Sequence, residues 1–184
     1  MTLNYCLEKS KTCLLIVDVQ EKLFPVMERT CEVMHAIQKI ARAFSIMNLP
    51  IIVSEQYPEK LGHTILGLKN LLGDTPLVLT KTTFSCMADP LFADALKPYE
   101  QVVIVGIEAH ICVLQTAKDL LKNGIQVVVL NDAITSRSIY DFSTAIAELR
   151  DAGSRISSVE TIIFELLENS KAPEFKQIKE LVTS

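Results

Sequence analysis

Short runs of β-branched residues alternate with helical patterns along the chain. In Val102–Val105 every side chain is apolar and β-branched, which is typical of a parallel strand buried on both faces. The helical pattern that follows ends near Asn123 and Gly124, which are typical of a helix C-terminus. Repeated alternation predicts a mostly parallel six-stranded sheet in a single-domain, Rossmann-like three-layer α/β/α sandwich. The predicted strands are Leu14–Val17, Ile51–Val53, Leu77–Thr80, Val102–Val105, Val127–Leu130 and Arg155–Ser157.

Helical patterns occupy the intervals between these strands. Ser157 and Glu160 have the spacing of a capping box, which predicts the start of a helix there. Pro173 separates a last amphipathic helix from the rest of the chain. The predicted helices are Cys31–Met47, Leu66–Leu72, a short helix after Pro90, one led by Cys112, Asp141–Ala152, Val159–Leu167 and Glu174–Val182.

Length and composition indicate one domain spanning residues 1–184. A chain of 184 residues and 20.5 kDa can bury a sizeable core without disulfides or metals. Its net charge is −4 and it has no Lys/Arg-rich stretch, so nucleic acid is not an expected partner. Hydrophobic residues make up 49%, yet no apolar run approaches the ~18 residues of a membrane helix. The hydrophobic surplus predicts the subunit interfaces of a homo-oligomer.

The cysteines predict a reducing, intracellular compartment. Their number is odd, and they show neither C-x-x-C spacing nor a zinc-type Cys/His cluster. The N-terminal segment has no basic start or cleavable apolar region of the signal-peptide kind. We therefore expect free thiols in the cytoplasm, with the mitochondrion as the alternative location. The five residues are Cys6, Cys13, Cys31, Cys86 and Cys112.

Cys112 is the candidate nucleophile. It stands where a buried strand gives way to a helix, in the predicted first helical turn. Unpaired N–H groups and the positive end of the helix dipole stabilise an anion there, which predicts a lowered thiol pKa. The alternative is that Cys112 is only a small buried hydrophobe.

Two further strands end in charged residues. The first strand leads into Asp18, and the strand at Leu77–Thr80 leads into Lys81. Because the carboxyl ends of parallel strands line one crevice, we expect an acid, an amine and a thiol at the same edge of the sheet. Asp18 would then accept the thiol proton while Lys81 favours the thiolate. The alternative is a structural ion pair at the sheet edge.

The loop between the Val102–Val105 strand and Cys112 is a candidate oxyanion hole. If its backbone N–H groups converge near the thiol, they can stabilise a tetrahedral intermediate; otherwise it is an ordinary turn. His110 is two residues from Cys112, so on a helix the two side chains point ~200° apart and a Cys-His dyad is not expected.

Neither a cofactor nor a metal is predicted. The chain has no G-x-G-x-x-G or Walker loop, and its three histidines show no ligand pattern. The loops beside Asp18 and Lys81 carry aromatic residues that can wall a pocket for a small, partly apolar substrate. The predicted pocket residues are Gln20, Phe24, Tyr57, Phe84 and Ile111.

The chain resembles the isochorismatase-like cysteine hydrolases. Asp18 in LLIVDVQEKLF, Lys81 in LTKTTFSC and Cys112 in GIEAHICVLQTAKDL are similar to the aspartate, lysine and cysteine of that family. The resemblance covers nearly the whole chain, and SEQYPEKLGHT at residues 54–64 is most similar to the isochorismatase domain-containing subgroup. It implies an Asp-Lys-Cys triad and a cis peptide bond between Ile107 and Glu108. It also implies an oxyanion hole formed by the N–H groups of Glu108 and Cys112.

The resemblance also bears on metal and substrate. Nicotinamidases bind a metal through Asp-x-His after the second strand, where this chain has Glu55–Tyr57, so neither a metal nor nicotinamide is implied. True isochorismatases lack the cysteine and cleave a vinyl ether, so Cys112 favours acyl transfer. Asn131–Ala133 with Ser136 and Arg137 resembles a further family motif, with strand-end capping and an ion pair as the alternative.

These observations favour a cofactor-independent cysteine hydrolase of a small amide or related C–N bond. In this hypothesis Asp18 is the base, Cys112 forms a thioester and Lys81 is the electrostatic partner. A second hypothesis is a non-catalytic, oligomeric binding or regulatory protein on the same fold. A third is a ribonuclease, since some members of the subgroup have carried that label.

Overall fold

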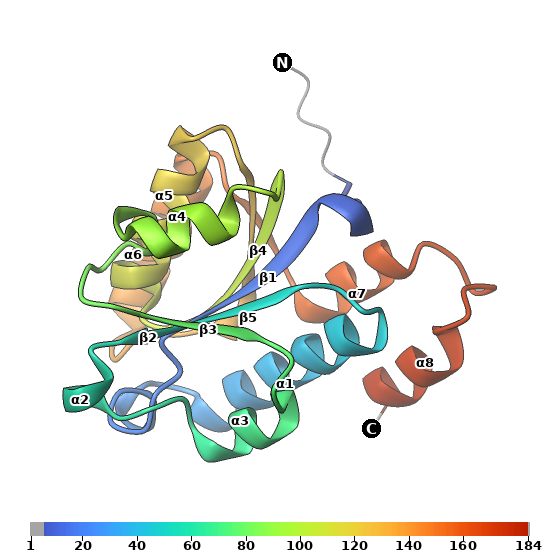
Figure 1. Ribbon diagram of the computed structural model, residues 1–184, viewed down its shortest axis with the longest axis horizontal. Helices are drawn as coiled ribbons and strands as arrows, with labels where there is room; N and C mark the ends of the chain where they lie inside the picture. Colours follow the sequence, from blue (N-terminus) through green and yellow to red (C-terminus); the bar gives the residue numbers. More distant parts are fainter. Residues whose placement is uncertain (1–5, 184) are drawn as a thin grey trace.

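The computed structural model describes residues 6–183, which form an α/β domain around one six-stranded sheet (Figure 1). All neighbouring strands are parallel, and their order is β3-β2-β1-β4-β5-β6. This is the Rossmann order, so the predicted fold class is confirmed, with a fully parallel sheet among the described strands. The strands are β1 (Thr12–Val17), β2 (Ile51–Gln56), β3 (Leu77–Lys81), β4 (Gln101–Gly106), β5 (Gln126–Ile134) and β6 (Arg155–Ser157).

The central strands separate two apolar clusters. Every residue of β1 and β4 is buried, which explains their uninterrupted apolar runs. Because side chains alternate between the faces of a strand, Leu14 and Ile16 belong to one cluster and Leu15 and Val17 to the other. The sheet is therefore the shared middle layer of a sandwich.

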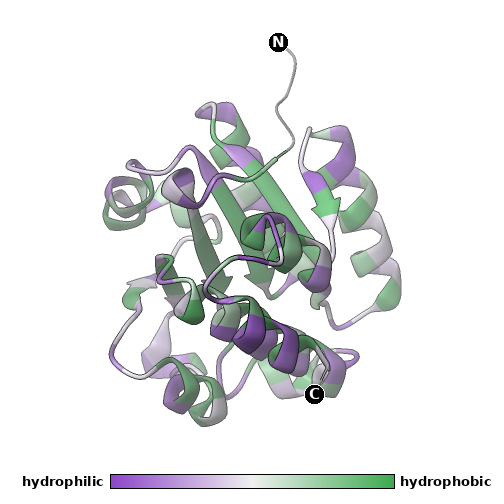
Figure 2. Cartoon of the chain, turned by 90° about the vertical axis from the view of Figure 1, so that its right-hand side faces the viewer, coloured by the Kyte–Doolittle hydropathy of each residue, from purple (hydrophilic) through white to green (hydrophobic). Residues whose placement is uncertain are grey.

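Helices cover both faces of the sheet (Figure 1). Residues of α1, α3, α7 and α8 join the cluster of Leu14, and those of α4, α5 and α6 join the cluster of Leu15. Figure 2 shows the hydrophobic strands enclosed between these helices. The helices are α1 (Thr30–Ile46), α2 (Pro58–Leu61), α3 (Leu66–Leu72), α4 (Pro90–Leu96), α5 (Leu114–Lys122), α6 (Ile139–Asp151), α7 (Val159–Leu167) and α8 (Phe175–Thr183).

Several helices differ from the prediction: α6 begins at Ile139 rather than Asp141, α2 was not predicted, the start of α5 is displaced, and the N-cap of α7 lies one residue later than expected. The residues around Cys112 form a π-helical turn, η4 (Ala109–Val113), and the regular helix α5 begins only after it. Helix α7 is capped by Ser158, whose hydroxyl accepts from the N–H of Thr161, because Ser157 still belongs to β6. The capping-box pattern was thus one residue out of register.

Gly106 allows β4 to end against β1. Its φ is +114°, and a Cβ atom added there would lie 2.1 Å from the carbonyl oxygen of Val17. The peptide bond between Ile107 and Glu108 is cis, and the N–H of Ile107 donates to the Val17 oxygen at 2.9 Å. A side chain at position 106 would therefore push apart the two strands that lead to Asp18 and Cys112.

We expect Gly106→Ala to lower the free energy of unfolding by more than about 3 kcal/mol, because it adds a backbone collision to an unfavourable φ. Chemical denaturation monitored by circular dichroism measures this loss. Gly124→Ala is the matched control, since Gly124 has φ +79° and an added Cβ would meet no packed neighbour within 4 Å, and it should lose only about 1–2 kcal/mol. Equal losses in the two variants would contradict the proposed collision.

Candidate active site

The predicted catalytic residues lie at the carboxyl edge of the sheet. Asp18 directly follows β1, Lys81 is the last residue of β3, and Cys112 lies in η4 after β4. Strand order reverses between β1 and β4, the point at which open α/β sheets form their ligand crevice. The fold therefore brings residues 18, 81 and 112 to one place, although they are far apart in sequence.

A buried ion pair joins two of these residues. The Lys81 Nζ lies 2.7 Å from Asp18 Oδ2, and the two side chains are 0% and 1% exposed. The same ammonium donates to Gln56 Oε1 at 2.7 Å and to the Thr83 carbonyl oxygen at 3.2 Å. An ammonium has three hydrogens, so each has an acceptor. Burial is the largest single influence and acts to lower the pKa of Lys81, but Asp18, Cys112 and Cys86 together hold that pKa above its usual value.

The Asp18 carboxylate is fixed on its other side by Ser54. The Ser54 hydroxyl donates to Asp18 Oδ1 at 2.6 Å, and the Asp18 N–H donates to the Ser54 carbonyl oxygen at 3.1 Å. Asp18 itself has a left-handed backbone, with φ +53°. Ser54 of β2 therefore donates to one carboxylate oxygen, and Lys81 of β3 donates to the other.

The charges of Asp18 and Lys81 both shift the pKa of the Cys112 thiol. Its residue is 7% exposed, and burial raises its pKa well above the usual value. The Asp18 carboxylate raises it further, while Lys81 opposes that effect. The sequence-based expectation of a lowered thiol pKa is therefore wrong, because burial and a nearby anion outweigh the position at a helix start. The thiol is neutral at pH 7, and ionisation needs a base.

The loop before Cys112 is fixed by contacts to the segment after β5. Glu108 Oε2 accepts from Arg137 Nε at 3.0 Å, and the Ala109 N–H donates to the Thr135 carbonyl oxygen at 2.8 Å. His110 Nδ1 lies 2.9 Å from Ser136 Oγ, which directs the ring toward this segment. This contact agrees with the expectation that His110 does not form a dyad with the cysteine.

The motif at residues 131–137 has structural contacts. Asp132 accepts hydrogen bonds from the N–H of Val159, the first residue of α7. Arg137 forms an ion pair with Glu108. These are the capping and ion-pair contacts that the sequence offered as the alternative to substrate binding.

The five predicted pocket residues fall into two groups. Gln20 is completely buried and accepts from the Gln56 N–H at 2.7 Å, and Phe24 is 4% exposed within the apolar core. Tyr57 and Phe84 are 45% and 56% exposed, and Ile111 is partly buried. Contact of any of them with substrate remains a prediction. Ser54 and Gln56, which hold the ion pair, carried no sequence signal because they look like ordinary strand residues.

Two negative findings apply to residues 6–183. No group of three or more His, Cys, Asp or Glu side chains there could hold a metal ion. None of the helices within that range combines the length and the apolar character needed to span a bilayer.

Comparisons with known proteins identify the family. A family model named Isochorismatase domain matches residues 12–161. The secreted isochorismatase effector Isc1 of Phytophthora sojae is 34% identical over 174 residues, covering 92% of this chain and 83% of that protein. Isochorismatase domain-containing protein 2 of Danio rerio is 35% identical over 173 residues, covering 92% and 85%. The solved structure of MAR1 ribonuclease from Caenorhabditis elegans has a TM-score of 0.93 at 37% identity, covering 97% and 93%.

A parallel α/β domain with polar residues at its switch point defines a class of small-molecule binding and catalytic proteins. Within that class, this chain belongs to the isochorismatase family. Membership of that family supports hydrolase activity.

If the Asp18 charge helps to keep the thiol protonated, Asp18→Asn should make Cys112 titrate at a lower pH than in the parent protein. Ionisation of the thiol can be followed by the ultraviolet absorbance of the thiolate as the pH is raised. Subtracting the absorbance of the matching Cys112→Ala variant leaves the contribution of Cys112 alone. Asp141→Asn removes a half-exposed carboxylate on α6 and should leave the titration unchanged. A thiol that titrates at higher pH in Asp18→Asn would contradict the assigned electrostatics.

Proposed function

We propose that this protein is a cofactor-independent cysteine hydrolase of a small amide or related C–N bond. The observation that carries the proposal is the fully buried Lys81–Asp18 pair, whose charges act on the thiol of Cys112. A buried ion pair is expensive to desolvate and is weak evidence for stability. A nucleophile, a base and a fixed cation at a ligand crevice together match the requirements of covalent catalysis.

In the first half-reaction Asp18 accepts the Cys112 proton as the sulfur attacks the substrate carbonyl carbon. The negative charge that develops on oxygen is held by the N–H groups of Glu108 and Cys112. Within residues 6–183 the Glu108 N–H has no hydrogen-bond acceptor, which supports its use as an oxyanion donor. The ion pair between the Glu108 side chain and Arg137 steadies this part of the loop.

The tetrahedral intermediate then collapses to a thioester as Asp18 returns its proton to the leaving amine. In the second half-reaction Asp18 takes a proton from water as the water oxygen attacks the thioester carbon. The intermediate then releases the acid while Asp18 returns that proton to the Cys112 sulfur, which restores the thiol and the carboxylate. Lys81 remains charged throughout, because its three hydrogens are already directed to Asp18, Gln56 and Thr83. Its role is to stabilise the ionised carboxylate between proton transfers.

We expect Cys112→Ala to lower turnover of a small amide by at least ~10³-fold, because the variant lacks the proposed nucleophile. Asp18→Asn should lower it by ~10²–10⁴-fold, since a neutral amide cannot accept the thiol proton. Ammonia release from a panel of small primary amides measures turnover. Hydroxylamine, which captures a thioester as a hydroxamate, tests the intermediate directly.

The matched control is Cys13→Ala. Cys13 is also buried, and burial raises its pKa to about 12, but it lies within β1 away from the carboxyl edge. It should keep turnover. Unchanged turnover in a folded Cys112→Ala variant would refute the mechanism.

The same panel separates the other two functions. A binding or regulatory protein would release no ammonia and give no hydroxamate with any amide. A ribonuclease, the name carried by the Caenorhabditis elegans relative, would cleave an RNA oligonucleotide in a salt-sensitive manner. The net charge of −4 favours the small-molecule substrate over RNA.

We also propose that the protein acts as a homo-oligomer inside the cell. All five cysteines are free, which fits a reducing compartment. Large apolar side chains are exposed in the loops and helix starts beyond the carboxyl ends of the strands, which fits a subunit interface. Sedimentation velocity should give a mass that is a multiple of 20.5 kDa, and a monomer at all concentrations would contradict the interface. The exposed residues are Val26, Tyr57, Phe84, Leu91, Ile139 and Tyr140.

A further inference from the structure

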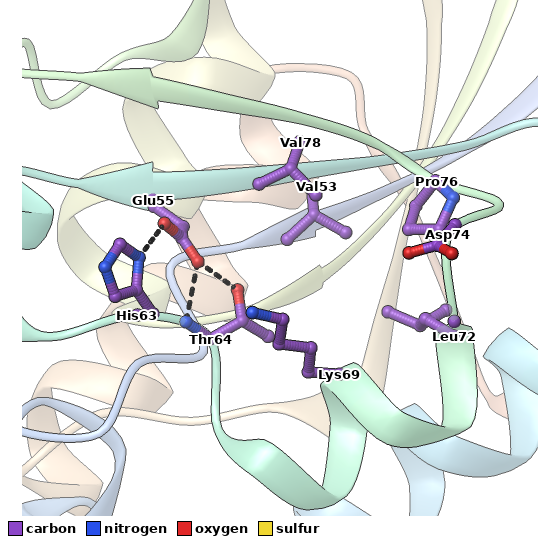
Figure 3. Close-up of a pocket in the computed structure, with 10 residues that line it drawn as sticks. Val53, Glu55, His63, Thr64, Lys69, Leu72, Asp74, Pro76 and Val78 are labelled. Carbon is purple, nitrogen blue, oxygen red and sulfur yellow. Dashed lines mark hydrogen bonds and ion pairs between the residues drawn. The ribbon is translucent and has the colours of Figure 1, made fainter.

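A second cavity lies on the other face of β2 from the catalytic residues. It measures about 330 Å³ and runs between β2, β3 and α3 (Figure 3). Side chains alternate along β2, so Val53 and Glu55 face this cavity, whereas Ser54 and Gln56 hold the Asp18–Lys81 pair. The proposed hydrolase mechanism uses none of the residues that line it.

One end of the cavity is polar and internally satisfied. Glu55 accepts from the N–H and the hydroxyl of Thr64 at 2.7 and 2.8 Å, and its other oxygen lies 2.9 Å from His63 Nδ1 (Figure 3). Burial acts to raise the pKa of Glu55, but these hydrogen bonds hold it below the usual value. Glu55 is therefore an ionised carboxylate whose hydrogen bonds fix this end of the cavity.

Two other charged side chains in the lining, both exposed to solvent, have no partner among the described residues. Lys69 of α3 and Asp74, which follows that helix, form no side-chain hydrogen bond or ion pair with any residue from 6 to 183. Side chains on a helix lean toward its N-terminus, and Figure 3 shows Lys69 extending toward Thr64. Asp74 lies at the opposite end of the cavity (Figure 3).

The distance between the Glu55 end and the Asp74 end of the cavity follows from the register of β2 and β3. Glu55 pairs with Thr80, whereas Ile52 pairs with Leu77 at the start of β3, just after Asp74. Three strand residues span about 10 Å. The floor between the ends is apolar and consists of Val53, Leu72, Pro76 and Val78.

We propose that this cavity binds a small zwitterion of the ω-amino acid class. Its carboxylate would pair with Lys69, its ammonium would pair with Asp74, and its methylene chain would lie on the apolar floor. About five bonds of an extended chain span ~6 Å, and a hydrogen bond at each end brings the total close to the length of the cavity. A volume of about 330 Å³ is at the small end of ligand pockets, which suits such a molecule.

Calorimetric titration of the full chain with 5-aminovalerate tests the proposal. We expect saturable binding, on the order of 0.1–1 mM for so small a ligand. Lys69→Met and Asp74→Asn should each weaken it about tenfold or more, because each leaves one charge of the ligand without its partner. Valerate and pentylamine each lack one of the two charges, so the parent protein should bind each of them about tenfold or more weakly than 5-aminovalerate.

Controls separate this cavity from the catalytic site. Lys60→Met removes an exposed ammonium on α2 outside the cavity and should leave binding unchanged. Binding should also survive alkylation of Cys112, so it does not depend on the proposed hydrolase mechanism. The inference is overturned if 5-aminovalerate does not saturate, if binding survives both cavity substitutions, if alkylation abolishes it, or if 1,5-diaminopentane binds more tightly.

Discussion

The buried ion pair between Lys81 and Asp18 is the interaction on which the carboxyl edge of the sheet depends. Neither side chain contacts solvent to any useful extent, so each charge needs the other and the hydrogen bonds around them. Removing one partner from such a pair typically costs about 3–5 kcal/mol. The pair exists because β3 and β1 flank β2, whose residues Ser54 and Gln56 bond to Asp18 and Lys81. The strand order of the sheet therefore determines the electrostatics of the site.

The protonation state of Cys112 follows from that pair. A helix start would lower a thiol pKa, but here a π-helical turn places the sulfur in a buried position beside an anion, and the pKa is raised. In the proposed mechanism, attack of this thiol on substrate would therefore require transfer of its proton to a base. Lys81 makes this arrangement stable, because without a cation the carboxylate would be buried alone.

Much of the fold was accessible from the sequence because buried parallel strands carry a strong local signal. The runs of β1 and β4 predict their own burial, and parallel strand ends predict that Asp18, Lys81 and Cys112 converge. The supporting contacts were not accessible, because Ser54 and Gln56 have no distinguishing pattern and act through strand register. The pKa of Cys112 was mispredicted for a related reason, since burial is a property of tertiary packing.

Strand β2 presents side chains to two different regions of the protein, the ion pair and the cavity beside α3. Its alternation directs Ser54 and Gln56 to the ion pair and Val53 and Glu55 to the opposite cavity. Gln20 joins the two sides, because its side chain bonds to the backbone of Gln56 while its own backbone bridges to Thr64, which binds Glu55. A ligand that shifted Glu55 would therefore act on a strand whose next residue, Gln56, accepts a hydrogen bond from Lys81.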